Sequence, residues 1–397
     1  MKKILIALSF AAVVTACNGF LDMTPTDSIS DKVMWADTQS AEYAVNSIYS
    51  YAYDIFAAWP SSVGMTEAFT DEFKYGSYVN FAFCLIPSQV AYGGTNLTNS
   101  FVSVYLGCWS SLYDAVRRTN EAISNLKSLG GNLPEADRVR LEGELRLMRG
   151  WLYFELVKRY KEVILYDEDL TQIKVEKALS SEAEGWEFIW NDLDFAARNL
   201  PEKAAAKGRL DKGVALALIT RAMLYAGEYD KVIAAADELA FLGYALMPDY
   251  GQAFTVPVTA GNTETILQYS FSYADGVTHD FDFYYTPGGD YKLVGQQGGG
   301  YGTPTPGMVE SYELAEGGFP DWSPWHGETM AQPPYDRLEP RFKATILYNG
   351  APWKGRTIEP FVGGTDGWCQ WNKEPKPEGR TTTGYYLRKV VGETHNN

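Results

Sequence analysis

The stretch from residue 143 to 165, GELRLMRGWLYFELVKRYKEVIL, constrains the fold more than any other part of the chain. At helical spacing it carries two apolar stripes. The first stripe consists of Leu141, Leu145, Met148, Leu152 and Leu156, and the second of Leu147, Trp151 and Phe154, with Glu144 and Glu155 on the seam between them. A surface helix needs only one apolar stripe, so two stripes predict a helix packed between neighbours on both sides. Such a helix is typical of the centre of a large helical domain or of a stacked helical array.

Other segments of helical periodicity surround this one and predict a mainly α scaffold. They occupy residues 38–58, 102–129, 181–200, 212–225 and 229–242, and the central helix opens at Pro134. The last two segments are joined by a short turn around Gly227 and carry small residues at the packing positions, as in a tetratricopeptide-like hairpin. We therefore expect the helical scaffold to lie mainly in residues 38–58 and 102–246.

Residues 61–100 and 247–397 have a different character, rich in Gly, Pro, Trp and Tyr with only short apolar runs. This composition predicts irregular structure with a few strands or short helices, held on a rigid scaffold. No internal linker is long enough to separate two domains, so residues 37–397 are expected to form one domain.

Two aromatic stretches in the irregular part, FDFYYTPGGDY at 281–291 and FPDWSPWHGE at 319–328, predict a surface for sugars. A sugar ring has an apolar face of C–H groups and an edge of hydroxyls. It is therefore bound by flat aromatic rings flanked by amide, carboxylate or guanidinium groups. The alternative interpretation is that these aromatic side chains cover a core.

The first residues predict export and lipidation. Lys2 and Lys3 precede an apolar run at 4–14 that is too short to span a bilayer, as in a signal peptide of residues 1–16. Cys17 follows a small residue, as in a bacterial lipobox, where the Cys is lipidated and becomes the new N-terminus; residues 17–36 would then be a tether. The alternative is an ordinary signal peptide with an incidental Cys.

Composition argues against several classes of function. With 50 acidic and 34 basic residues the net charge is −16, which excludes the basic footprint of a nucleic-acid-binding protein. Three histidines and four cysteines without a CxxC pair leave no metal site or cofactor to expect.

The chain lacks HExxH, GxSxG and Walker motifs, so we predict no catalytic residues. A secreted glycoside hydrolase would need paired carboxylates such as Asp280 with Asp282, or Glu310 with Glu313. The glycine cluster at 298–302 is expected to be a flexible turn.

Several short segments form a series in order along nearly the whole chain. They are Cys17-Asn18-Gly19-Phe20-Leu21-Asp22 with Pro25; Trp109-x-x-x-Tyr113 with Asn120; Gly143-Glu144 with Arg149-Gly150-Trp151-x-Tyr153-Phe154; Gly208-Arg209 with Ala215-Leu216-Ala217 and Leu224-Tyr225-Ala226-Gly227-x-Tyr229; Asn262-x-Glu264; Pro340-Arg341-Phe342-x-Ala344-Thr345; and Thr383-Gly384-Tyr385-Tyr386-Leu387-Arg388-Lys389. Together these segments resemble the SusD/RagB family of outer-membrane nutrient-binding lipoproteins of Bacteroidetes-type bacteria.

The resemblance implies tetratricopeptide-like helix pairs bearing an irregular binding half. It also implies a non-catalytic lipoprotein, lipid-anchored at Cys17 in the outer membrane and facing the cell exterior. Such a protein captures a glycan and delivers it to a SusC-like TonB-dependent transporter. By position, the loops that would form the aromatic binding arc contain Tyr75, Tyr78, Tyr284, Tyr285, Trp322 and Trp325.

One departure from the family concerns the end of the chain. Members continue past the segment matching 383–389 into another helical stretch that closes the array. We therefore expect a truncated sequence, or an exposed helical face that something else covers. An alternative interpretation of the predicted helices is that the protein is a helical-repeat adaptor, which binds proteins or peptides.

Overall fold

A computed structural model describes the chain from residue 30 with gaps. The described residues are 30–57, 67, 70–74, 76, 108–174, 176–206, 208–272, 274, 276–279, 281–293, 299–300, 302–325, 333–367 and 380–393, with the backbone alone for 51–57, 173–174 and 292–293. The chain divides into two compact units, one of residues 1–51 and 114–201 and the other of 52–113 and 202–397. Each unit is described by itself below, and the single-domain boundary at 37–397 stays a prediction.

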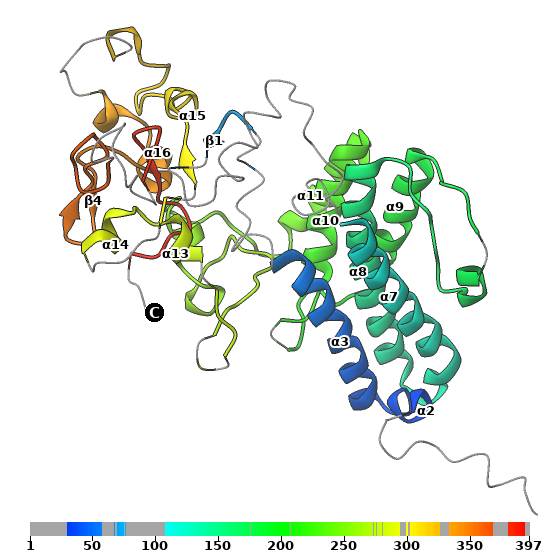
Figure 1. The fold of residues 1–397 in the computed structure, drawn as a ribbon. Helices are drawn as coiled ribbons and strands as arrows, with labels where there is room; N and C mark the ends of the chain where they lie inside the picture. Colours follow the sequence, from blue (N-terminus) through cyan, green and yellow to red (C-terminus); the bar gives the residue numbers. More distant parts are fainter. Residues whose placement is uncertain are drawn as a thin grey trace, which may run out of the picture. The chain divides into compact units, whose positions relative to one another are not determined.

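The first unit is helical, as predicted. Its elements are α2 (Asp31–Met34), α3 (Thr38–Ala57), α7 (Trp109–Leu129), the 3-10 helix η2 (Gly130–Asn132), α8 (Glu135–Tyr160), the 3-10 helix η3 (Leu170–Lys174) and α9 (Glu182–Asn199); the end of α3 and the start of α7 belong to the second unit. Within this unit α7, α8 and α9 lie side by side (Figure 1).

The predicted central helix is α8, and the residues of both apolar stripes are buried except Trp151, which is half-buried. Gly150 brings α8 close to α9, because a Cβ atom built on it would lie 2.9 Å from the side chain of Leu193. The seam residue Glu144 is also buried and accepts a hydrogen bond from the Tyr49 hydroxyl at 2.8 Å. Extension of the helix to residue 165 was wrong: it ends at Tyr160, and Lys161 has a φ of 62°.

Local signals set the start of α9 and the form of the next hairpin. Ser181 forms a capping box with Glu184, which satisfies free N–H groups at the helix start. In the second unit, α10 (Lys212–Ala226) and α11 (Tyr229–Ala240) pack as the predicted hairpin. Gly227 closes α10 in the left-handed conformation, with a φ of 75°.

The rest of the second unit consists of short elements, in agreement with the predicted irregular half. The helices are α12 (Gln252–Thr255), η4 (Val258–Ala260), α13 (Phe281–Tyr285), α14 (Gly289–Leu293), α15 (Pro306–Glu310), η6 (Ser323–Trp325), η7 (Tyr335–Arg337) and α16 (Pro340–Thr345). Three antiparallel pairs of strands are described: β1 (Phe73–Lys74) with β2 (Thr303–Pro304), β3 (Ile346–Leu347) with β6 (Tyr386–Leu387), and β4 (Pro352–Trp353) with β5 (Arg356–Thr357).

Large aromatic side chains form much of the core of this irregular part. Trp353, Tyr285, Tyr386 and Phe342 are among the largest fully buried side chains of the described residues. Within the described part of the chain, no helix combines the length and the apolar character needed to cross a bilayer.

Candidate functional site

The strand pair β1–β2 joins the loop that follows α3 to the irregular half. Lys74 pairs with Thr303, and the Thr303 hydroxyl donates to the Lys74 carbonyl at 2.9 Å. Gly76 lies so close to the backbone of Gly300 that a Cβ atom on it would be 2.0 Å from the Gly300 carbonyl oxygen. The two regions predicted to share a binding arc therefore meet in one small sheet. The predicted residues Tyr75 and Tyr78 themselves lie outside the described residues.

Two of the predicted site residues lie in the core rather than on the surface. Tyr285 is fully buried and its ring stacks on Phe281, with 4.4 Å between ring centroids. Trp322 is 9% exposed and packs against Tyr335 at 6.4 Å. These rings support the surface in this structure and do not present a face to solvent, which corrects our expectation of direct contact. The physical reason is packing: both rings fill the aromatic core, to which each of the two sequence stretches contributes one buried ring.

The remaining predicted rings lie at the edge of this core. Tyr284 and Trp325 are partly buried and pack against it, as does Tyr385, which our sequence reasoning missed. Trp325 meets Trp322 edge to face at 6.0 Å, and the hydroxyls of Tyr385 and Tyr335 are 2.9 Å apart. We call Tyr284, Trp325 and Tyr385 the rim. The only signal for Tyr385 was its place in the segment 383–389.

Neighbouring residues of α13 and the glycine cluster hold part of this rim in place. Phe283 is 41% exposed and contacts Tyr284 edge to face at 5.1 Å. Gly299 donates its N–H to the Phe283 carbonyl, and Gly300 donates to the Thr286 carbonyl, each at 2.8 Å. These two glycines, both with positive φ, thus contact α13 and the residue after it through their backbone.

A buried ion cluster fixes the next element, α14, to the β4–β5 hairpin. The Arg356 guanidinium donates to Asp366 at 2.7 Å and to Asp290 at 2.5 Å, and the Trp353 indole donates to Asp290 at 3.0 Å. Burial opposes the charge of Arg356, but hydrogen bonds and the charges of both carboxylates raise its pKa above the usual range. Lys354 also pairs with Asp290, at 3.2 Å, so two cations balance the two carboxylates and the cluster positions the loops.

Of the carboxylates considered for hydrolysis, the structure describes Asp282, Glu310 and Glu313. Asp282 accepts the N–H of Gly392 at 2.9 Å, and Asp280 lies outside the described residues. No group of three His, Cys, Asp or Glu side chains among the described residues is arranged to hold a metal ion.

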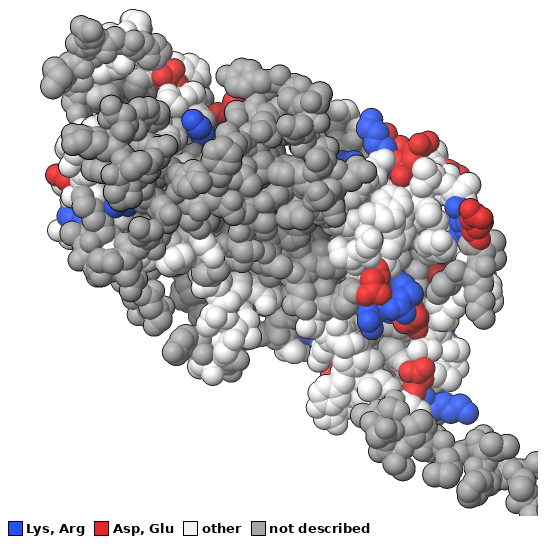
Figure 2. Space-filling model, viewed as in Figure 1, with Lys and Arg blue, Asp and Glu red and all other residues white. Residues whose placement is uncertain are grey.

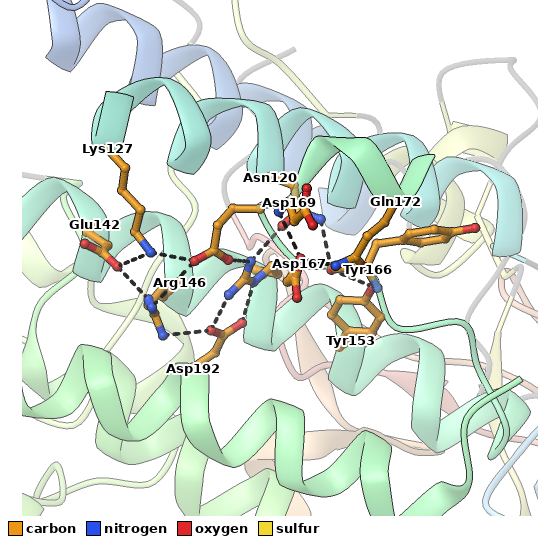
Figure 3. Close-up of polar contacts among 12 residues, drawn as sticks. Asn120, Lys127, Glu142, Arg146, Tyr153, Tyr166, Asp167, Asp169, Gln172 and Asp192 are labelled. Carbon is orange, nitrogen blue, oxygen red and sulfur yellow. Dashed lines mark hydrogen bonds and ion pairs between the residues drawn. The ribbon is translucent and has the colours of Figure 1, made fainter. Parts of the chain in front are cut away.

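The helical unit contains a second buried charge cluster, drawn in Figure 3. Arg149 on α8 donates two hydrogen bonds to Asp192 on α9, each 2.7 Å long. It also reaches Asn120 on α7 and Glu168 in the loop before η3, each at 2.8 Å. Burial opposes its charge, but Asp192 and Glu168 raise the pKa of Arg149 above the usual range. This cluster ties three helices and a loop together.

Exposed charges of the helical unit are paired as well. On the face drawn in Figure 2, several of the described Lys and Arg side chains of the helical unit lie beside Asp and Glu side chains. Arg117, for example, bridges Asp114 at 2.8 Å and Glu121 at 2.6 Å. Such pairs favour the helix surface slightly and mark no ligand.

Comparison with known proteins accounts for this combination of a helical unit and an aromatic irregular unit. A SusD-like family model described as "Starch-binding associating with outer membrane" matches residues 19–224. The chain belongs to the SusD family. A second model, described as "SusD family", matches residues 263–397, and one for a prokaryotic membrane lipoprotein lipid attachment site matches residues 1–18. The predicted family and the predicted lipobox are thus confirmed, although Cys17 lies outside the described residues.

Relatives with sequence similarity carry the same family name. A SusD-like protein from Bacteroides ovatus is 26% identical over 229 residues, which are 56% of this chain and 39% of that protein. One from Formosa agariphila is 26% identical over 220 residues, which are 55% of this chain and 41% of the relative. This SusD-family chain therefore spans about two fifths of the length of these relatives.

Solved structures share the fold over most of this chain. A SusD-like protein from Bacteroides fragilis superposes with a TM-score of 0.71 at 25% identity, covering 94% of this chain and 72% of the other. A laminarin-binding SusD-like protein gives a TM-score of 0.63 at 20% identity, covering 89% of this chain and 72% of the other. These likenesses confirm the expected fold, a mainly helical scaffold with an irregular half.

Proposed function

We propose that this SusD-family protein binds a polysaccharide or oligosaccharide without chemically altering it. The observation that carries the proposal is the rim: Tyr284, Trp325 and Tyr385 are partly exposed rings fixed from below by a buried aromatic core. Rings held in one orientation lose little entropy when a sugar stacks on them, which is the property a glycan-binding surface needs.

The proposal includes location and partner. The lipid attachment site and the family description support a lipid-anchored protein of the outer membrane. We place the lipid on Cys17, the body on the cell exterior, and a SusC-like TonB-dependent transporter as the recipient of the glycan. Solved relatives include one named for laminarin binding and one determined with a xylogluco-oligosaccharide, which supports glycans as the ligand class.

Affinity electrophoresis of the mature protein in gels containing laminarin, xyloglucan or soluble starch tests the proposal. We expect retardation in at least one gel, and about tenfold weaker binding for Trp325→Ala because a stacking ring is lost. Tyr229→Ala is the matched control, since Tyr229 is an exposed ring (63%) on α11. Trp322→Ala is expected to lower stability as well as binding, because Trp322 is buried. Absence of binding to every glycan would overturn the proposal, and undiminished binding by Trp325→Ala would remove the rim.

A separate experiment tests the proposed transporter partner. Co-purification of the lipidated protein with a TonB-dependent transporter from detergent-solubilised outer membranes is expected. Recovery of the protein without any such transporter would contradict the delivery step and leave glycan binding intact.

A further inference from the structure

A second group of exposed rings lies before α13, away from the sequence stretches that supplied the rim. Tyr269 is 38% exposed and Phe271 is 42% exposed. Their rings meet edge to face at 4.8 Å, and Phe271 meets the exposed His279 ring in the same way at 4.6 Å. The Phe271 ring therefore stands nearly perpendicular to both neighbours, with interplanar angles of 82° and 70°. We call these three side chains the platform.

The backbone beneath the platform is anchored at both ends. Ser272 and Val277 exchange two backbone hydrogen bonds, of 2.7 and 3.0 Å, across a turn that contains Gly276 in the left-handed conformation. On the other side, buried Asn262 donates to the carbonyls of Ala253 and Val256 and accepts from the N–H groups of Glu264 and Thr265. The exposed rings are thus presented by a fixed segment.

Exposed polar residues alternate with these rings along the chain. Gln268, Ser270 and Thr278 are exposed, and the Gln268 amide donates to the Ser270 hydroxyl at 3.3 Å. His279 accepts the N–H of Phe281 at Nδ1, at 3.2 Å, which places the proton of the neutral imidazole on Nε2. This Nε2–H group is a hydrogen-bond donor beside the Phe271 ring.

The chemistry of these side chains indicates the ligand class. Two exposed apolar rings beside an imidazole donor match the C–H face and the hydroxyl edge of a sugar.

We propose that Tyr269, Phe271 and His279 form an additional subsite that stacks and hydrogen-bonds a pyranose unit of the glycan. The subsite rests on the proposed glycan-binding function, because its ligand is a further unit of the same polymer. It extends the aromatic surface through His279 and Phe281 to the start of α13, the helix that carries Tyr284.

The decisive variant is the double substitution Tyr269→Ala with Phe271→Ala in the mature protein. We expect about tenfold weaker binding to whichever of laminarin, xyloglucan or soluble starch retards the wild type, because two stacking rings are lost. Tyr229→Ala again serves as the control for loss of an exposed ring, and an unchanged melting temperature of each variant shows that it has folded.

A direct readout comes from the imidazole resonances of the three histidines, assigned with His279→Gln. Saturating oligosaccharide from the same glycan is expected to shift the His279 signal in the wild type and not in the double variant. Equal binding by the double variant and the wild type, or an unmoved His279 signal, would overturn the subsite while the rim remains. Failure of the wild type to bind any of the three glycans would instead overturn the proposed function itself.

Discussion

The two units each bury an arginine between two carboxylates, and they use it differently. In the helical unit, Arg149 joins α8 to α9, helices of 26 and 18 residues that satisfy most backbone groups internally. In the irregular unit, Arg356 joins β5 to α14, elements of two and five residues. Side-chain bonds position existing elements in the first case, whereas in the second they replace the regular backbone pairing that such short elements lack.

The hydrophobic cores of the two units also differ, in the kind of side chain that they bury. The helical unit packs leucines and alanines, and Gly143 and Gly150 allow α8 to approach α9 closely. The irregular unit packs Trp, Tyr and Phe rings, which bury large areas without needing a repeating interface. A rigid aromatic core next to solvent naturally leaves some rings at its edge, and these rings form the proposed binding surface.

The largest effect should follow from breaking the helical cluster. Arg149→Met leaves Asp192 and Glu168 without their main partner, and we expect a loss of about 3–5 kcal/mol in the free energy of unfolding. Urea unfolding followed by far-ultraviolet circular dichroism measures it. Arg198→Met is the matched control, since Arg198 is exposed and pairs with Asp194 on the helix surface, and it should cost less than about 1 kcal/mol. Equal effects of the two substitutions would contradict the role given to Arg149.

The equivalent substitution in the irregular unit should lower the free energy of unfolding by less and should change a different spectroscopic signal. Arg356→Met is expected to cost about 2–3 kcal/mol, because the cluster is closer to solvent. The near-ultraviolet signal, which includes Trp353, should change while the far-ultraviolet helix signal of the native protein stays the same. If the far-ultraviolet helix signal of this variant also falls, the cluster around Arg356 does not act on the irregular unit alone.

Low pH should destabilise the cluster around Arg149 in the helical unit. Burial alone would raise the pKa of Glu168, but hydrogen bonds from Arg149 and Lys127 lower it to about 2. A carboxylate with a lowered pKa stabilises the fold above its unfolded pKa, and this stability is lost as pH falls towards the folded value. We expect a loss on the order of 2–3 kcal/mol between about pH 4.5 and 2, measured by urea unfolding. Glu168→Gln should flatten the pH dependence in this window; an unchanged slope would exclude Glu168 as its source.

The smallest expected loss of stability concerns the N-terminal cap of α9. Ser181→Ala removes the capping box of α9 and should cost about 1 kcal/mol, because N–H groups at the helix start lose their acceptor. Ser181→Asp keeps an acceptor and should stay close to the wild type in the same unfolding experiment. If both variants lose the same stability, the cap does not act through its side chain.

Sequence reasoning succeeded where structure depends on neighbours along the chain. Thr38 was predicted as the start of α3 and is its first residue, and the turn at Gly227 was predicted from its surroundings. The extension of α8 to residue 165 failed, since the sequence has no Gly or Pro to mark the stop and Lys161 itself adopts a positive φ.

Tertiary structure alone decided which aromatic side chains reach the surface. Tyr284 and Tyr285 are adjacent and chemically identical, yet one lies at the rim and the other is fully buried. The contacts that decide this join distant positions: 66 residues separate Asp290 from Arg356, and 229 separate Lys74 from Thr303. Helical periodicity and capping are local, so the sequence by itself determined the scaffold and the family. Pairing across such separations leaves no periodic pattern in a single sequence, so only the folded chain determines which rings reach the proposed binding surface.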